Sequence, residues 1–191
     1  MSTELNNLKL IIAPNPLLNK ISKAVELFDS TLQNLLDKML EVMYKEQGIG
    51  LAAVQIGVLS RVLVMDTSYS LVHDDNHSHD HHNSKCSHYK AVNKNPQCFI
   101  NPEIIEFDDE KVLFKEGCLS VPEQRIEVKR FKTIKVKYLD HNFSEQIKVF
   151  EGLESICLQH EIDHLNGITI VEKLSPLKAQ ILKKKLTKFY H

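Results

Sequence analysis

The segment HEIDH, which runs from His160 to His164, constrains this chain more than any other feature of its sequence. Helical spacing of the surrounding apolar residues and the Asn166-Gly167 pair predict a helix over residues 152–167. Two histidines four residues apart lie on one helical face, about a turn apart, so both imidazoles can bind one ion. Glu161 is placed to contact a water on that ion and to move its proton. The motif therefore predicts a divalent metal site that hydrolyses an amide bond.

The third metal ligand is expected upstream of this helix. Downstream, Ile170 stands where the extended motif HExxHxxGxxH has its last histidine, and Glu172 is the only acidic residue. Cys118, in KEGCLSVPE, is the best candidate, because a thiolate binds zinc or ferrous iron and the adjacent glycine permits close backbone approach. Cys157 competes with it, but lies on the helical stripe of the two histidines and suits a pocket wall. Cys98 has strand-forming neighbours and suits a small buried residue.

Residue patterns elsewhere predict an α+β fold, in which antiparallel β-sheets pack around a central metal-binding helix, with an N-terminal helix and a C-terminal helix. Residues 31–46 have apolar side chains at helical spacing, with Ser30 as a candidate N-cap and Gly48 as the stop. Residues 48–57, GIGLAAVQIG, are expected to form a loop of small residues. This loop leads into a short buried strand at residues 61–66.

The sequence between that strand and the metal helix divides into a polar part and a strand-forming part. Residues 67–95 are rich in Ser, Asp, Asn and Lys and hold six of the ten histidines, so we expect a mobile, His-rich surface loop. Residues 98–149 include RIEVKRFKTIKVKY, whose alternation of apolar and basic residues is typical of antiparallel strands with one wet face. After the metal helix, Ser175 and Pro176 begin a C-terminal helix.

Length and composition favour one soluble domain. The 191 residues, of which 42% are hydrophobic, are enough for a single domain with its own core. The 24 basic side chains nearly balance 25 acidic ones, which argues against a surface built for nucleic acid. No apolar run approaches the roughly 20 residues of a membrane span, and the first residues lack a signal sequence. We therefore expect a single catalytic domain over residues 1–191 in the cytoplasm, with neither membrane nor specific nucleic acid as a partner.

Three ordered segments resemble the motifs of the peptide deformylase family: GIGLAAVQ at 48–55, EGCLS at 116–120 and QHEIDHLNG at 159–167. The resemblance extends from Glu116 to the C-terminus almost throughout. It departs at Val54, where many members have proline, and in the longer segment after the first strand. The resemblance implies a hydrolase that removes the formyl group from N-formylmethionine of nascent polypeptides and releases formate.

The resemblance also implies roles for individual residues. One divalent metal, commonly Fe2+ in the cell with Zn2+, Ni2+ or Co2+ as replacements, would be bound by Cys118, His160 and His164. Glu161 would be the general base and acid, while the Gln55 side chain and the Leu119 backbone N–H would bind the oxyanion. The peptide would bind as an added strand in a cleft. The substrate-binding residues would be Ile49, Gly50, Leu51, Glu116, Gly117, Arg125, Leu153, Ile156 and Cys157.

Several assignments have simpler alternatives. Leu153 and Ile156 suit core packing as well as a pocket, and Arg125 could equally form a structural salt bridge. The lysines of the C-terminal helix suit a solvated face, whereas the resemblance implies that this helix docks on the ribosome. For the chain as a whole, the alternatives are a metal-dependent peptidase and a catalytically inactive ribosome-associated module.

Overall fold

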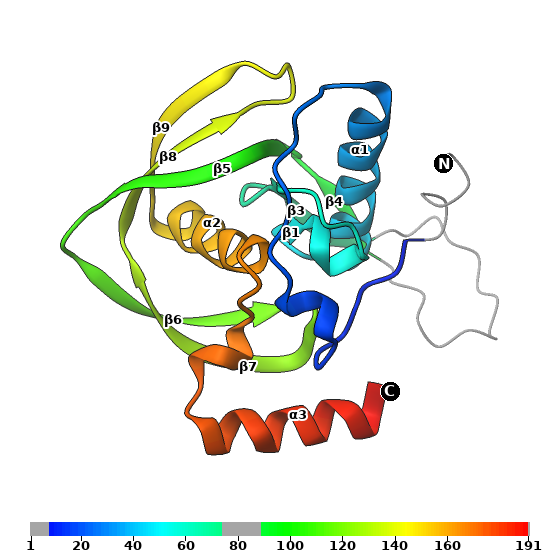
Figure 1. The fold of residues 1–191 in the computed structure, drawn as a ribbon, viewed down its shortest axis with the longest axis vertical. Coiled ribbons are helices and arrows are strands. Elements are labelled where there is room, and N and C mark those ends of the chain that lie inside the picture. The colour runs from blue at the N-terminus through cyan, green and yellow to red at the C-terminus, as the bar shows by residue number, and fades with distance from the viewer. Residues whose placement is uncertain (1–7, 74–88, 191) are drawn as a thin grey trace.

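The computed structural model describes residues 8–73 and 89–190, and it confirms the α+β fold class (Figure 1). In these ranges the α-helices are α1 (Ser30–Lys45), α2 (Gly152–Leu165) and α3 (Pro176–Tyr190). Short 3-10 helices are η2 (Pro16–Asn19), η3 (Ala53–Ile56) and η4 (Ile170–Lys173). The N-terminal, central and C-terminal helices thus lie where the sequence predicts them.

The strands of the described ranges form three antiparallel sheets. The largest has the order β1 (Gly50–Ala52), β2 (Val62–Met65), β5 (Gln97–Phe107), β8 (Thr133–Leu139) and β9 (Glu145–Glu151). The two-stranded sheets pair β3 (Ser70–His73) with β4 (Tyr89–Val92), and β6 (Lys111–Cys118) with β7 (Val121–Phe131). The alternating basic sequence is confirmed as strands, but it covers β7 and β8, which belong to different sheets.

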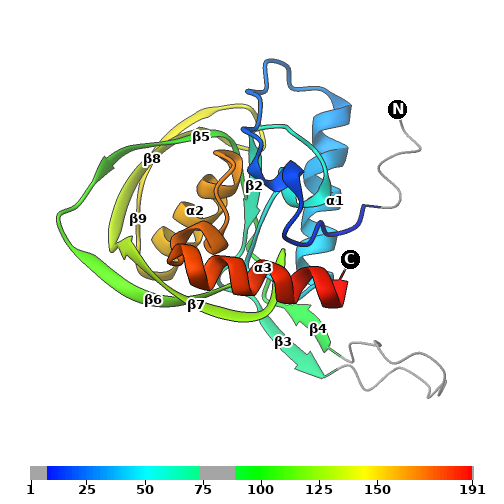
Figure 2. The same cartoon turned by 60° about the horizontal axis from the view of Figure 1, so that its bottom comes forward.

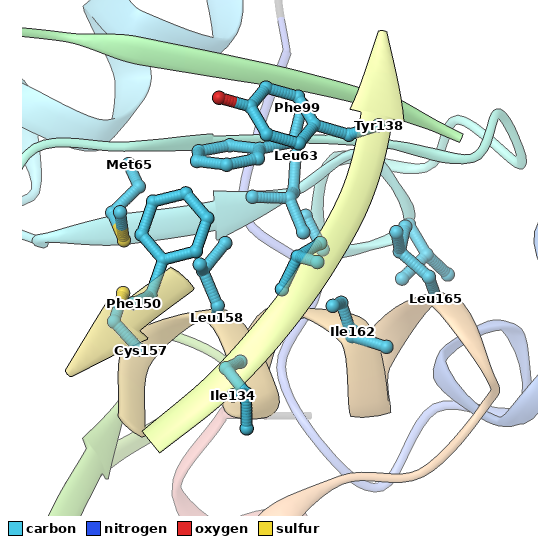
Figure 3. Close-up of a cluster of buried hydrophobic side chains, with 13 residues drawn as sticks. Leu63, Met65, Phe99, Ile134, Tyr138, Phe150, Cys157, Leu158, Ile162 and Leu165 are labelled. Atoms are coloured by element: carbon cyan, nitrogen blue, oxygen red, sulfur yellow. The ribbon is translucent and has the colours of Figure 1, made fainter. Parts of the chain in front are cut away.

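Helix α2 lies between the five-stranded sheet and the β6–β7 hairpin (Figure 1). Every residue from Ser155 to Ile162 is buried, so the helix is enclosed on all sides and not along one stripe. Figure 3 shows Leu158 and Leu165 of this helix packed with Leu63 and Phe99 of the sheet, and none of the four side chains is exposed. Close packing of this kind holds the histidine-bearing helix rigidly.

The N-cap of helix α1 differs from the predicted one. The N-cap is Asp29, whose carboxylate accepts a hydrogen bond from the backbone N–H of Leu32 at 2.9 Å. The prediction of Ser30 as the cap was wrong, because Asp29 has the extended backbone that a cap requires and Ser30 is the first helical residue. The apolar stripe of the helix, including Met39 and Met43, is buried against the sheet as expected.

Two segments expected to be loops contain regular structure. Residues 50–56 form β1 and η3, all of them buried, and a strand of three residues is too short for alternation to reveal it. Within residues 67–95, β3 and β4 pair with each other as a hairpin that extends away from the rest of the molecule (Figure 2). Residues 74–88, which hold five of the histidines of this segment, lie outside the described ranges.

Helix α3 packs on the β6–β7 hairpin through Leu182 and Leu186 (Figure 2). Most of its other side chains are exposed, including Leu177, Ile181 and Phe189. Within residues 8–73 and 89–190, no helix combines the length and the apolar character needed to cross a membrane.

Candidate metal centre and its cleft

The three predicted metal ligands meet in one place. The ligand atoms of Cys118, His160 and His164 all lie within 4.8 Å of one another, and Cys118 Sγ is 3.2 Å from His164 Nε2. Cys118 ends β6 at the tight connection to β7, and both histidines lie on α2. A thiolate and two imidazoles are the donor set that binds zinc or ferrous iron, so the residues present fit a divalent metal.

The state of His164 also suits a ligand. Its Nδ1 atom is buried and has no hydrogen-bond partner among the described residues. Burial, with the charges of His160 and Arg130, holds the pKa of His164 well below its usual range. The imidazole is therefore neutral, which metal binding requires.

The imidazole of His160 is oriented by a buried ion pair. Its Nδ1 atom lies 2.8 Å from Oε2 of Glu116, and Arg130 donates to both Glu116 oxygens at 2.6 and 3.0 Å. Burial alone would raise the pKa of Glu116, but the hydrogen bonds from His160 and Arg130 outweigh it and lower that pKa. An ionised Glu116 can accept the Nδ1 proton of His160, which leaves Nε2 available to a metal once its own proton is displaced.

Glu161 is a buried carboxyl group next to these ligands. Its Oε2 atom has no hydrogen-bond partner among the described residues. Burial raises the pKa of Glu161 to about 7; the charge of His160 opposes this effect and that of Glu116 adds to it. A carboxyl group with a pKa near neutrality can both accept and release a proton at physiological pH.

Gly50 leaves the space that Glu161 occupies. A Cβ atom at position 50 would lie 2.6 Å from Oε1 of Glu161 and 2.7 Å from Sγ of Cys157, both closer than real Cβ contacts. Any larger residue would displace one of these buried side chains. Position 50, in the motif at residues 48–55, therefore requires a glycine for steric reasons.

The side-chain amide of Gln55 is directed at the metal ligands. Its Oε1 atom accepts from the backbone N–H of Ala52 at 2.8 Å, and its Nε2 atom donates to Ser120 Oγ at 3.2 Å. The second Nε2 contact, to Cys118 Sγ, is 3.7 Å long. These bonds fix the amide so that its nitrogen points towards Cys118, the residue before Leu119.

A cleft leads from the surface to the metal centre. Most of the predicted substrate-binding residues line it: Ile49, Gly50, Glu116, Gly117, Arg125, Leu153, Ile156 and Cys157. Leu51 is the exception, because its side chain has no exposed area and packs in the core against α1. We correct that assignment: the side chain of Leu51 supports the wall from behind.

Three alternatives for cleft residues can be compared with their surroundings. Leu153 is 40% exposed and Ile156 only 5%, yet both line the cleft, so neither is solely a core residue. The guanidinium of Arg125 packs over Gly117, where a Cβ atom would lie 3.0 Å from Nη1. Arg125 is thus at the rim of the cleft and not inside a buried ion pair.

Arg130 and Phe114 are among the residues at the site that were not found from the sequence. Arg130 follows the buried Ile126 and Val128 at intervals of two along β7, so the strand period would have placed it on the inward face. Phe114 lines the cleft and precedes Glu116 by two residues on β6, so the same period applies. Arg130 was missed because the alternation along β7 was interpreted from its apolar members alone.

Comparison with known proteins gives one consistent result. The family model described as polypeptide deformylase matches residues 7–180. The peptide deformylase of Rhizobium meliloti (strain 1021) is 40% identical over 94% of this chain and 91% of its own length, and that of Zymomonas mobilis is 43% identical over 95% and 93%. The crystal structure of peptide deformylase from Ehrlichia chaffeensis in complex with actinonin superimposes with a TM-score of 0.80 at 38% identity, covering 96% of this chain and 98% of that one.

Proposed function

This chain belongs to the peptide deformylase family, and on that basis we propose how its residues remove the formyl group from N-formylmethionine of nascent polypeptides. The activity is a metal-dependent hydrolysis that releases formate. The observation that carries the assignment of residues is the meeting of Cys118, His160 and His164 within 4.8 Å, beside the buried carboxyl group of Glu161.

The metal would be held by Cys118, His160 and His164. Fe2+ is the proposed ion in the cell, with Zn2+, Ni2+ or Co2+ as replacements, because one thiolate and two imidazoles suit each of them. When bound, the ion supplies Lewis acidity, which activates a water nucleophile and polarises the formyl carbonyl. Glu116 and Arg130 keep the His160 ring in the orientation that this binding needs.

Glu161 moves the proton. Its carboxylate accepts a proton from the attacking water as oxygen bonds to the formyl carbon, and later delivers it to the amine as the C–N bond breaks. The products are formate and a free N-terminal amine. Burial, which raises the pKa of Glu161 to about 7, makes both transfers accessible to one group.

Gln55 and Leu119 stabilise the negative charge that develops on the carbonyl oxygen. Gln55 Nε2 donates a weak hydrogen bond to Cys118 Sγ, and the two atoms are 3.7 Å apart. A nearby oxyanion can take the place of Sγ as the acceptor. The backbone N–H of Leu119 is the second donor. Each such donor contributes about 3 kcal/mol when it is held in place before reaction.

The cleft binds the peptide. The methionine side chain would lie against the apolar residues of α2 that face the cleft, Leu153, Ile156 and Cys157. The peptide backbone would lie along the 48–50 segment and the end of β6, both of which line the cleft.

The test is formate release from the tripeptide formyl-Met-Ala-Ser by protein loaded with Fe2+ under anaerobic conditions. Wild-type protein should release formate and leave internal peptide bonds intact. Glu161→Gln should retain its metal and lose turnover by at least about 100-fold. Glu154→Gln, on the same helix, is the matched control and should retain both.

Two outcomes would reject this function. Cleavage of internal bonds without formate release would identify a peptidase. Full metal content with no turnover of either kind would identify an inactive module.

A ribosome contact through α3 is also proposed, in the cytoplasm where nascent chains emerge. The supporting feature is the row of mostly exposed lysines: Lys178, Lys183, Lys184, Lys185 and Lys188. Co-sedimentation with ribosomes should weaken as salt rises from about 50 to 200 mM. Replacing Lys184, Lys185 and Lys188 with Glu should abolish it, whereas the same change at the exposed hairpin residues Lys111, Lys115 and Lys129 should not.

A further inference from the structure

Behind one wall of the cleft, a buried carboxylate holds together three separate parts of the chain. Asp66, directly after β2, has no exposed area and accepts the hydroxyl of Tyr44 on α1 at 2.6 Å. It also accepts the backbone N–H groups of Ser68, Tyr69 and Asn95, at 3.0, 3.2 and 2.8 Å, and the Ser68 hydroxyl at 2.9 Å. Burial alone would raise the pKa of Asp66, but these hydrogen bonds outweigh it and lower that pKa.

This arrangement fixes the position of Tyr69. The backbone of Tyr69 is bound to Asp66, and its ring packs edge-to-face on Tyr44 with the centroids 5.1 Å apart. Tyr69 is half-buried, and the strand that begins with the next residue, Ser70, leads away from the body of the protein (Figure 2). Tyr69 is therefore held by Asp66 and Tyr44, neither of which is among the described residues that line the cleft.

The hydroxyl of Tyr69 reaches the cleft wall. It donates to the carbonyl oxygen of Gly48 at 3.0 Å, and the backbone N–H of Asp66 donates to the carbonyl oxygen of Ile49 at 2.9 Å. Gly48, Ile49 and Gly50 line the cleft. Tyr69 and the backbone of Asp66 thus anchor two consecutive carbonyls of this wall.

Gly48 is the place where such an anchor has most effect. A Cβ atom there would lie 2.7 Å from Cδ1 of Leu119, so the backbone of the wall touches the residue after the metal ligand Cys118. The preceding residue, Gln47, has a left-handed backbone with φ of 58°, and a glycine follows it. The backbone N–H of Gly48 donates to the carbonyl oxygen of Met43 at 2.9 Å, and the Tyr69 hydroxyl adds a second restraint at the carbonyl end of the same residue.

We propose that Tyr69 is a positioning residue for substrate binding, which holds the 48–50 wall at the correct distance from the opposite wall of the cleft. The inference rests on the proposed function for the identity of the substrate. Within the described residues, the contacts of Tyr69 are with Asp66, Tyr44 and Gly48, and its hydroxyl reaches the cleft wall at Gly48. Its loss should therefore weaken peptide binding equally in the ground state and in the transition state, and leave the chemical step unchanged.

The test compares Tyr69→Phe with Tyr44→Phe in the full-length, metal-loaded enzyme. Both changes remove one tyrosine hydroxyl from the surroundings of Asp66 and keep the aromatic ring. Only the first removes the hydrogen bond to Gly48. KM and kcat are measured with formyl-Met-Ala-Ser, and the Kd of the product Met-Ala-Ser is measured by calorimetry. Urea unfolding of both variants reports their stability.

Tyr69→Phe should raise KM and the product Kd by about 3- to 10-fold, the effect of one lost hydrogen bond, with kcat within about twofold. Tyr44→Phe should leave KM and the product Kd within about twofold of the wild-type values, even if its urea unfolding midpoint falls further than that of Tyr69→Phe.

The proposal is overturned if Tyr69→Phe leaves both binding constants unchanged, or if Tyr44→Phe raises them equally. In the second case, general loosening around Asp66 would be the cause. If the wild-type protein releases no formate, the proposed function fails, while the product Kd still decides the role of Tyr69.

Discussion

The Nδ1 atom of His160 and the Oε2 atom of Glu116 lie 2.8 Å apart, and both groups are buried. The carboxylate comes from β6 and the imidazole from α2, 44 residues further along the chain. Arg130, on the neighbouring strand β7, joins Glu116 to Asp163 of the metal helix. Glu116, Arg130, Asp163 and His160 therefore form one connected group of charged and hydrogen-bonded side chains.

Glu116→Gln tests the link to the metal. The amide has no charge to stabilise the Nδ1–H of His160 and cannot replace the ion pair with Arg130, so metal affinity should fall by about 10- to 100-fold. Competition with a fluorescent chelator measures this affinity. Glu127→Gln, an exposed position on the same hairpin, is the control. Equal affinities in the two variants would contradict the orienting role of Glu116.

Arg130→Ala tests the contribution of the buried ion pairs to folding. Without the guanidinium, Glu116 is a buried carboxylate that has lost its cationic partner, and the free energy of unfolding should fall by about 3–5 kcal/mol. Urea unfolding of the metal-free protein provides the measurement. The exposed Lys132, paired with Glu110, is the control, because its replacement by Ala should hardly move the midpoint. A loss below about 1 kcal/mol in Arg130→Ala would refute this account.

Gly50→Ala tests the space beside Glu161. The added methyl group must displace Glu161 or Cys157, and a shift of this size in the proton-transfer group should lower kcat by about 10- to 100-fold. Gly152→Ala is the control, since its Cβ meets no atom within 4 Å and its positive φ costs stability only. Steady-state formate release measures both variants. Normal kcat in Gly50→Ala would show that Glu161 tolerates movement.

The pKa of Glu161 predicts how the stability of the metal-free protein changes with pH. The folded protein keeps the Glu161 proton up to about pH 7, whereas the unfolded chain loses it near pH 4.3. Between these values the folded state binds more protons, so stability falls as the pH rises. The Glu161→Gln variant has no carboxyl group at this position, so its stability does not fall for this reason as the pH rises.

The variant should therefore gain stability over wild type as the pH goes from about 5 to 8, as measured by urea midpoints of the two metal-free proteins. If the difference between the midpoints is the same at both pH values, the burial of an ionised Glu161 is not costly.

The local features of this protein were predictable from its sequence. Helix α2, its C-terminal cap at Asn166 and the start of α3 at Pro176 follow from spacing and capping residues. The two strands of the 67–95 segment were missed because each has only four residues inside a mostly polar segment, and within the described residues each pairs only with the other. The N-cap of α1 was misplaced by one residue, since Asp29 and Ser30 have almost the same capping preference.

The sequence by itself determined that His160, Glu161 and His164 share one site, because a spacing of three or four residues on a helix sets their separation without reference to the rest of the chain. The sequence also made Cys118 the best candidate for the third metal ligand. Only the tertiary structure decided what surrounds them. The positions of Glu116, Arg130 and Tyr69 relative to the site depend on how a hairpin and a sheet pack around α2, and no spacing along the chain encodes those distances.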